Sequence, residues 1–364
     1  MEKVYNFKEI ERKWRQYWIE NKTFSAKSDG SRKPFSMFIP PANITGSLHM
    51  GHALNATLQD IIIRFKKLKG YNTLWIPGTD HGGIATQNVV EKLLKKEGRT
   101  KYDLGREKFL ERMQQWKTET DSAILDQLKR LGCGLDWDRL AFTMDESRSK
   151  AVKKAFIKLF DKGLIYRGKR LVNWCSRCAT ALSDIEVEYE DEKSNLWYIK
   201  YPLKDCGECI IVATTRPETM LGDTAVAVNP DDNRYVKLIG KTVKLPFVGR
   251  EIKIISDYAI NKFFGTGAVK VTPAHDAVDN EIGKRSSLEA IEVIDTSGRM
   301  INVPSRYLGL SVEEARKEIV KDLEALGLLV KAEDYTHSVG KCYRCSAKVE
   351  SLMSEQWFLT STSR

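Results

Sequence analysis

The chain carries Pro40-Pro41-Ala42-Asn43-Ile44-Thr45-Gly46-Ser47-Leu48-His49-Met50-Gly51-His52, in which two histidines lie three residues apart. A helix is predicted from about Ala53 to Gly70, because apolar residues recur there at helical spacing: Leu58, Ile61, Ile62, Phe65 and Leu68. The start of a helix favours an anion, since its backbone N–H groups and its dipole point toward the ligand. Two imidazole donors at this place therefore predict a site for a polyphosphate.

A single histidine here would more often be a buried core residue, so the pair and its surroundings carry the argument. Gly46 and Gly51 allow the backbone to approach a ligand closely, as in other nucleotide-binding folds. Strand-like runs at 36–39 and 73–76 lie on either side of the helix, and further amphipathic helices follow. This alternation predicts an α/β fold, the first half of a doubly wound, Rossmann-like sheet.

Three further helices are predicted in the N-terminal part. The first has an aromatic-rich face formed by Phe7, Ile10, Trp14 and Trp18. The others span about 106–131 and 149–162, and the last of these is basic. We expect the apolar stripes of these helices to pack in the core rather than to bind a ligand.

Length and composition set broad limits. A chain of 364 residues with 42% hydrophobic residues can bury a large core in about two or three domains. The net charge of +10 suits a polyanionic partner, although a solvated basic surface explains it equally well. Neither an apolar run long enough to cross a bilayer nor a signal-like N-terminus is found, so a cytoplasmic location is expected.

Six of the seven cysteines form three Cys-x-x-Cys pairs, and cytoplasmic thiols stay reduced. The pair Cys206 and Cys209 lies before a strand-like run and is interpreted as a hairpin turn without a metal, while Cys133 stands alone. The other two pairs can close one tetrahedral zinc site, whose predicted ligands are Cys175, Cys178, Cys342 and Cys345.

The two metal pairs bracket residues 179–341, so one zinc ion would hold the neck of an inserted domain. Short β runs separated by turn residues predict a mainly-β, barrel-like insert; they lie at 196–201, 210–213, 225–228, 251–255 and 268–271. The predicted organisation is the N-terminal half of a catalytic domain at 1–178, the insert at 179–341, and a return to the catalytic domain at 342–364.

Two polar segments of the insert directly follow strand-like runs. The first is 214–219, and the second is 265–276, with Asp279 just beyond it. Hydroxyls, a cation and two carboxylates at strand ends could form a small polar pocket. Ordinary loop polarity explains the composition at least as well.

At the histidine motif and in two nearby segments, the sequence resembles a known family. His49-Met50-Gly51-His52 is similar to the "HIGH" signature of class I aminoacyl-tRNA synthetases, and the segments 40–46 and 77–87 resemble the valyl-tRNA synthetases. The isoleucyl and leucyl families would show a Trp-Asp-Cys-His-like or Trp-Asp-Ala-Phe-like pattern where this chain has Thr79-Asp80-His81. The resemblance runs to about Phe358.

The resemblance implies a valine–tRNA ligase that uses ATP with Mg²⁺ to activate valine and transfers it to tRNA-Val, with a structural zinc ion. It implies a monomer without a membrane partner. His49 and His52 would stabilise the charge of the transition state on the ATP phosphates. Asp80 would hold the α-ammonium and Pro41 would line the side-chain pocket; the implied valine and ATP contacts are Pro41, Asn43, Thr45, Gly51 and Asp80.

The resemblance also implies an editing pocket that hydrolyses mischarged threonyl-tRNA. Lys270 would meet the threonine hydroxyl and Asp279 the α-ammonium. The residues that fall on the family's substrate-contacting positions are Arg216, Phe264, Lys270, Thr272, Asp276 and Asp279. The sequence departs from the family's usual pattern at Ala277-Val278-Asp279-Asn280 and at Ser286. The resemblance therefore assigns Asp276 and Asp279 but does not define the geometry of the local helix.

The family's second ATP motif, Lys-Met-Ser-Lys-Ser, is not found in this sequence, and 359–364 has the character of a truncated end. We therefore expect weak or no valine activation by this chain alone. A stand-alone editing hydrolase and a non-catalytic tRNA-binding fragment stay open as alternatives. Valine-dependent exchange between ATP and pyrophosphate separates the ligase from both.

Overall fold

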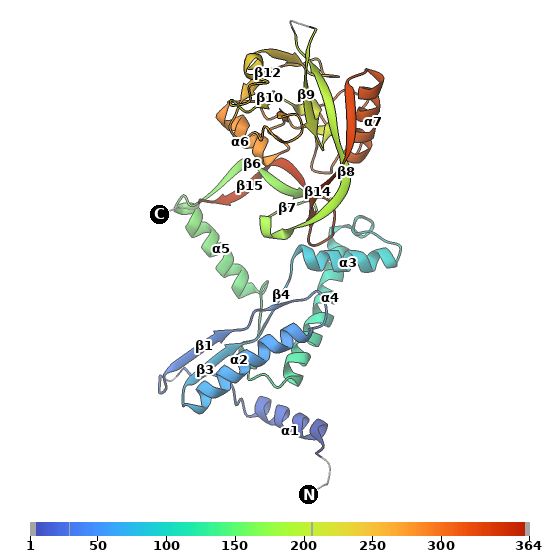
Figure 1. Cartoon of the computed structure of the whole chain (residues 1–364). Helices are drawn as coiled ribbons and strands as arrows, with labels where there is room; N and C mark the ends of the chain where they lie inside the picture. The colour runs from blue at the N-terminus through green and yellow to red at the C-terminus, as the bar shows by residue number, and fades with distance from the viewer. Residues whose placement is uncertain (1–4, 29, 205–206, 361–364) are drawn as a thin grey trace. The chain divides into compact units, whose positions relative to one another are not determined.

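The computed structural model describes the whole chain except residues 1–4, 29, 205–206 and 361–364 (Figure 1). It divides into two compact units, Met1–Gly163 and Leu164–Arg364. The four zinc-predicted cysteines all belong to the second unit. The boundaries of the inserted domain, after residue 178 and after residue 341, stay a prediction.

The first unit contains parallel strand pairs connected by helices, which confirms the mixed α/β class. Strand β1 (Pro34–Phe38) pairs in parallel with β3 (Asn72–Ile76), and α2 (Met50–Leu68) lies between them in the chain. A second parallel set contains β2 (Ala42–Asn43), β4 (Gly78–Asp80) and β5 (Ala141–Phe142). The remaining helices are α1 (Phe7–Glu20), α3 (Ile84–Lys96), α4 (Lys101–Arg130) and α5 (Glu146–Asp161).

The core of the first unit is small. Trp75 of β3 is fully buried and packs with Ile63 of α2, Leu128 of α4 and Leu135. A separate cluster joins Val90 and Leu94 of α3 with Phe109 of α4, which confirms a core role for the apolar stripe of that long helix.

Two expectations for this unit were wrong. Helix α2 begins at Met50 rather than near Ala53, because the side chains of His49 and His52 close its first turn as a reciprocal cap. The apolar faces of α1 and of the basic helix α5 are not core, since no residue of either helix is buried and Trp14 of α1 is 46% exposed. Helical spacing places apolar residues on one face, but burial also requires an element that packs against that face.

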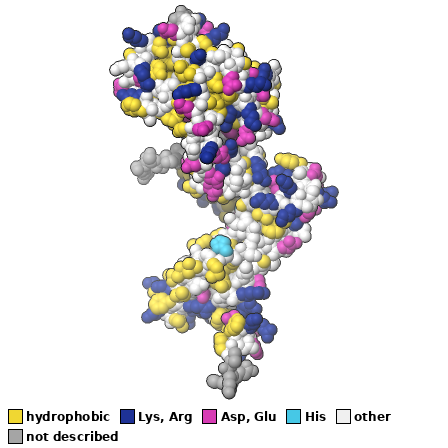
Figure 2. Space-filling model, turned by 45° about the vertical axis from the view of Figure 1, so that its right-hand side comes forward, with side chains coloured by type: hydrophobic (Ala, Val, Ile, Leu, Met, Phe, Trp, Pro, Cys, Tyr) yellow, Lys and Arg dark blue, Asp and Glu magenta, His cyan; other side chains and the backbone are white. Residues whose placement is uncertain are grey.

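The predicted apolar residues of α2 show the same effect. Leu58, Phe65 and Leu68 are 55%, 53% and 89% exposed, and Ile61 and Ile62 are exposed as well. Hydrophobic side chains accordingly gather on the surface of this unit (Figure 2). The two strands β1 and β3 cover only the side of α2 that carries Ala56 and Ile63.

The second unit is built on mostly antiparallel sheets. The long strands β8 (Val187–Pro202) and β14 (Leu329–Cys342) pair along most of their length, and β9 (Cys209–Thr214) pairs with β8. A four-stranded sheet has the order β11-β12-β10-β13, with bounds Thr242–Lys244, Glu251–Ser256, Ala225–Val228 and Ala268–Val271. In this sheet β10 pairs in parallel with β12. Each predicted β run of the insert is therefore a strand, while closure of the sheets into a barrel stays a prediction.

A third sheet contains the strand that ends at Cys175, whereas Cys342 ends β14 of the sheet that contains β8. The order of the third sheet is β15-β6-β7, with β15 at Glu350–Leu359, β6 at Ile165–Cys175 and β7 at Thr180–Leu182. The helices α6 (Ala277–Arg285) and α7 (Val312–Ala325) complete the unit. Its main core is large and joins fully buried residues of several elements, among them Ile199, Val226, Met220 and Leu323. No described helix is long and apolar enough to cross a membrane.

Candidate functional site

The two histidine rings of the first unit lie against each other at the start of α2, with centroids 3.9 Å apart and their planes tilted by 48°. His49 Nδ1 accepts a hydrogen bond from Gly51 N (3.1 Å), and His52 Nδ1 accepts one from His49 N (3.2 Å). A neutral imidazole that accepts at Nδ1 carries its proton on Nε2, so each ring can offer Nε2–H to an anion. Burial, reinforced by the charge of His49, lowers the pKa of His52.

A cavity of about 130 Å³ adjoins this pair. Gly51 is required there because a Cβ atom on it would lie 2.9 Å from the His49 ring. Pro40 lines the cavity, whereas Pro41, which the resemblance places in the side-chain pocket, is exposed. Parallel pairing of β2 with β4 brings Ala42 and Gly78 into the same lining.

Asp80 ends strand β4 directly beside Asn43 of β2. Its Oδ1 accepts hydrogen bonds from Thr143 Oγ1 (2.8 Å) and Gly82 N (3.3 Å). Thr143 Oγ1 also lies 2.7 Å from His81 Nδ1. The structure thus brings Asn43 and Asp80 together as predicted, with half-buried Thr45 two residues beyond β2. It adds Thr143, which sequence reasoning missed because it lies 63 residues along the chain from Asp80.

A second cavity, of about 430 Å³, lies in the second unit. Its wall contains five of the residues predicted for editing, namely Arg216, Phe264, Lys270, Asp276 and Asp279. Thr272 lies behind this wall, where it is buried and hydrogen-bonded to Lys270. The cavity also has Thr219, His275, Tyr335 and His337 in its lining, none of which was predicted as a site residue.

Lys270 is buried, and its ammonium is engaged within the protein. Nζ donates to Thr219 Oγ1 and Thr272 Oγ1, each at 2.7 Å, and lies 3.4 Å from Asp223 Oδ1. Asp223 is fully buried and also accepts from Tyr201 OH (2.7 Å). Burial raises the pKa of Asp223, and the charge of Lys270 opposes that shift. A ligand hydroxyl that reaches Lys270 must therefore replace one of these bonds.

The two predicted carboxylates differ in what they do. Asp276 is the N-cap of α6, because its Oδ1 accepts from the N–H groups of Val278 (2.8 Å) and Asp279 (3.1 Å). Asp279 accepts from Thr272 N (2.8 Å) on the side of β13 and does not cap the helix. Burial raises the pKa of Asp279 to about 7, against the effect of Lys270. Asp279 is therefore a buried carboxylate at the cavity wall that would gain from a cationic ligand.

His275 is a structural member of the same wall. Its Nε2 accepts from Val293 N (2.8 Å), and its Nδ1 lies 3.2 Å from the carbonyl oxygen of Ser351. Burial, and then the charge of Arg216, lowers the pKa of His275 to about 3, so the ring is neutral near pH 7. Both ring nitrogens are engaged by backbone groups, and the ring is not placed to act as a base.

The four cysteines predicted as zinc ligands converge, and their Sγ atoms all lie within 4.8 Å of one another. Cys175 and Cys342 are buried, whereas Cys178 and Cys345 are partly exposed. Each pair forms a tight turn, as the bonds from Cys178 N to Cys175 Sγ (3.4 Å) and from Cys345 N to Cys342 O (3.2 Å) show. The donor set fits one tetrahedral metal ion. Cys209 is exposed, and Cys206 lies outside the described residues.

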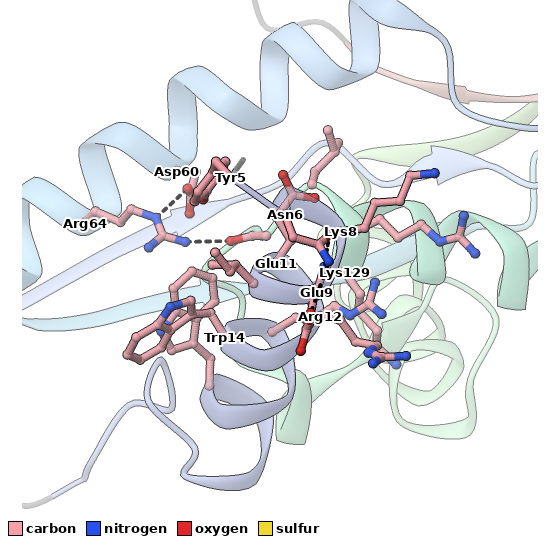
Figure 3. Close-up of a pocket in the computed structure, with 16 residues that line it drawn as sticks. Tyr5, Asn6, Lys8, Glu9, Glu11, Arg12, Trp14, Asp60, Arg64 and Lys129 are labelled. Atoms are coloured by element: carbon pink, nitrogen blue, oxygen red, sulfur yellow. Dashed lines mark hydrogen bonds and ion pairs between the residues drawn. The ribbon is translucent and has the colours of Figure 1, made fainter. Parts of the chain in front are cut away.

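A wide cavity of about 1340 Å³ adjoins α1 (Figure 3). Arg64 donates to Asp60 Oδ2 and to the carbonyl oxygen of Gly132, both at 2.6 Å, and its guanidinium lies over the Trp18 ring. Charges of both signs, such as Arg12 and Glu9, surround the cavity (Figure 3). No nucleophile with an adjacent base is found among its described lining residues, so it is not a candidate catalytic centre.

Comparison with known proteins agrees with the resemblance. The family described as "tRNA synthetases class I (I, L, M and V)" matches residues 13–363. The Valine--tRNA ligase of Thermotoga maritima is 56% identical over 98% of this chain and 41% of that protein. The corresponding protein of Clostridium perfringens is 53% identical over 98% of this chain and 40% of its own length. The chain thus spans about two fifths of the length of the curated relatives it matches.

A solved structure gives a more distant match. The LeuRS chain of a ternary complex with tRNA and LeuAMS, from Agrobacterium radiobacter K84, is 18% identical with a TM-score of 0.44. The match covers 95% of this chain and 49% of that one.

Proposed function

The chain belongs to the class I tRNA synthetases of the isoleucine, leucine, methionine and valine group. From this premise we propose that it functions as a valine–tRNA ligase. In the proposed reaction the carboxylate of valine attacks the α-phosphorus of ATP, and pyrophosphate leaves to give valyl-adenylate. A terminal ribose hydroxyl of tRNA-Val then attacks the valyl carbonyl carbon, and AMP leaves. The observation that carries the proposal is the histidine pair, whose Nε2–H donors lie beside a small cavity at the start of a helix.

The roles of the residues follow from their contacts. His49 and His52 stabilise the charge that develops on the phosphates, which is electrostatic preorganisation and requires no proton transfer. Asp80 binds the α-ammonium of valine, held in place by Thr143 and Gly82 N. Asn43 and Thr45 complete the amino-acid site from the adjacent strand. ATP enters as its Mg²⁺ complex.

A second reaction is proposed for the cavity of the second unit. An apolar pocket shaped for valine cannot strongly reject threonine, and this pair of amino acids is the standard illustration of that limit. A polar pocket that hydrolyses threonyl-tRNA removes the error, because valine would leave its buried hydrogen-bonding groups unpaired. Water attacks the ester carbonyl carbon, and the bond to the ribose oxygen breaks, which releases threonine and free tRNA.

In this pocket Asp279 binds the α-ammonium of the threonyl ester. Its carboxylate lies buried at the cavity wall, and its pKa, raised to about 7, falls when a cation arrives. The threonine hydroxyl joins the network of Lys270, Thr219 and Asp223 by exchange with one of their bonds. Arg216 and Phe264 line the same cavity and contact the tRNA end of the ester.

One Zn²⁺ ion is proposed at the four cysteines, in the reducing cytoplasm that keeps their thiols free. Cys175, Cys178, Cys342 and Cys345 would each supply one thiolate. Such a site stabilises the fold and has no part in the chemistry, because four protein ligands leave no position for a substrate.

A stand-alone editing hydrolase is a second candidate. The observation that favours it is that all lining residues of the cavity proposed for editing belong to the second unit, which has a large core of its own. Two assays on the 364-residue chain separate the candidates. Valine-dependent exchange between ATP and pyrophosphate supports the ligase, whereas hydrolysis of threonyl-tRNA without exchange supports the hydrolase. A chain that does neither contradicts both.

A further inference from the structure

Four charged side chains form a cluster at the wall of the cavity proposed for editing, linked as a continuous series of ion pairs in the order Glu350, Arg216, Glu218 and Arg316. Arg216 Nε donates to Glu218 Oε1 (3.0 Å), and its NH2 group donates to Glu350. Arg316 of α7 binds both carboxylate oxygens of Glu218, at 2.8 Å each. The cluster is electrically neutral, with two guanidinium and two carboxylate groups.

Only one of the four side chains reaches the cavity. Arg216 lines it and is 29% exposed, whereas Glu218, Glu350 and Arg316 are not part of its lining. Glu218 is fully buried, and the pKa of its carboxyl is held at about 2, because the Arg316 and Arg216 guanidinium groups outweigh the effect of burial. Glu218 therefore stays ionised as a fixed anchor for both arginines.

The third partner comes from a distant part of the chain. Glu350 is the first residue of β15 and pairs with Trp174, the residue before Cys175. The next residue, Ser351, accepts at its carbonyl oxygen from the ring of His275, which also lines the cavity. The start of β15 thus contacts two residues of the cavity wall, and it lies outside the segment 179–341 predicted as the editing insert.

We propose that Arg316 and Glu350 are positioning residues for editing, which hold the Arg216 guanidinium in one orientation at the cavity wall. This inference rests on the editing reaction proposed above, in which Arg216 contacts the tRNA end of the ester. Glu350 fixes NH2 from one side, and Glu218, itself fixed by Arg316, holds Nε from the other. An arginine with five donors and a long stem loses this orientation when either anchor is removed.

The kinetic test uses the full 364-residue chain and threonyl-tRNA. Glu350→Gln and Arg316→Met should each raise KM about tenfold while kcat changes less than about twofold, as expected when binding contacts are lost. Arg316→Lys should recover part of the affinity. Adding Arg216→Met to either variant should cause no further loss, because all three changes act through one group.

Two matched controls change ion pairs of β15 and α7 that do not touch the cavity. Glu355→Gln changes an exposed residue of β15 that pairs with Arg167, and Arg306→Met removes an ion pair with Glu318 and Asp322 of α7. Both controls should leave KM unchanged. Additive losses in the double variants, or an unchanged KM in both Glu350→Gln and Arg316→Met, would overturn the positioning role.

A second readout does not depend on activity. The Nε–H signal of Arg216, assigned by its loss in Arg216→Lys, should exchange slowly with solvent in the parent chain and at least tenfold faster in Glu350→Gln and Arg316→Met. Equal exchange rates in parent and variants contradict the inference. If the parent chain shows slow exchange that the variants lose, but no hydrolysis of threonyl-tRNA, the editing proposal fails while the positioning geometry stands.

Discussion

The two units of the chain differ in how far the apolar faces of their amphipathic helices are buried. In the first unit, helix α2 exposes Leu58, Phe65 and Leu68, and α1 buries none of its residues. In the second unit, the equally amphipathic α7 buries Ile319 and Leu323 completely. The apolar periodicity of a helix therefore predicts which face can be buried, whereas the number of opposing strands and loops determines whether that face is buried.

The energetic consequence is that the second unit can hold its fold by its own contacts, whereas the first keeps much apolar surface in water. Burial of apolar surface stabilises by roughly 25 cal/mol per Å², so the exposed face of α2 contributes little to the stability of its unit. The editing cavity lies in the well-packed unit, and the histidine pair lies in the other. Editing should therefore be the more robust of the two proposed reactions.

The largest expected effect concerns the metal. Replacing Cys175, Cys178, Cys342 and Cys345 together by serine should abolish zinc binding and strongly destabilise the second unit, because structural zinc contributes on the order of 10 kcal/mol in small sites. Mass spectrometry of the native protein and thermal melting measure both effects. Cys209→Ser, which changes an exposed thiol, should keep the zinc. Full zinc content in the quadruple variant would contradict the site.

A matched pair of substitutions tests the comparison itself. Leu323→Ala and Leu58→Ala remove the same atoms from the interior of a helix, but Leu323 is fully buried and Leu58 is 55% exposed. Leu323→Ala should lower the free energy of unfolding of its unit by about 2–5 kcal/mol, and Leu58→Ala by less than about 0.5 kcal/mol. Urea unfolding measures each value. Equal losses would show that the α2 face is covered in solution.

The free energy of unfolding of the second unit should fall as the pH rises and Asp279 ionises. The pKa of Asp279 is raised from near 4 to about 7 by burial, so between these values the folded state binds more protons than the unfolded chain. This contribution is therefore lost as the pH rises from about 4 to about 7. Asp279→Asn should raise the free energy of unfolding at pH 8 by about 4 kcal/mol and leave it unchanged at pH 4. A gain that is equal at both pH values would show that the ionised carboxylate is not its cause.

The same substitution should damage editing. Loss of a charge-assisted contact to the α-ammonium costs about 1.5–3 kcal/mol, which is about a tenfold to hundredfold loss of kcat/KM for threonyl-tRNA. Wild-type hydrolysis should increase from pH 6 to pH 8 as Asp279 ionises, and the variant should lack this increase. Asp276→Asn is the control, because asparagine caps a helix as well as aspartate does. A larger loss in the control would move the ammonium contact to Asp276.

The contrast between local and distant contacts also explains what the sequence could predict. The histidine pair, the strands of the insert and the four cysteines were predictable, because each depends on short spacing or on residue types with few structural uses. Asp279 was placed in the cavity wall through the resemblance, and its raised pKa follows from burial that no sequence pattern displays.

Residues that act through others were missed for a different reason. Glu350 meets Arg216 across 134 positions, and Arg316 meets Glu218 across 98. Asp223 was passed over although it stands two residues before a fully apolar strand, where a carboxylate requires buried partners. That mismatch between a charged residue and its apolar surroundings is the one signal that could have identified it.

The smallest expected effect lies in the less packed unit. Thr143 donates to the carboxylate of Asp80 (2.8 Å), and its hydroxyl also contacts His81 Nδ1. Thr143→Val keeps the shape of the side chain and removes this hydrogen bond, which is worth about 0.5–1.5 kcal/mol, so the Kd for valine, measured by calorimetry, should rise about threefold to tenfold. Thr143→Ser retains the hydroxyl and should stay close to wild type. If both variants weaken valine binding equally, the methyl group of Thr143 matters rather than its hydrogen bond, and Asp80 is held in place by Gly82 N alone.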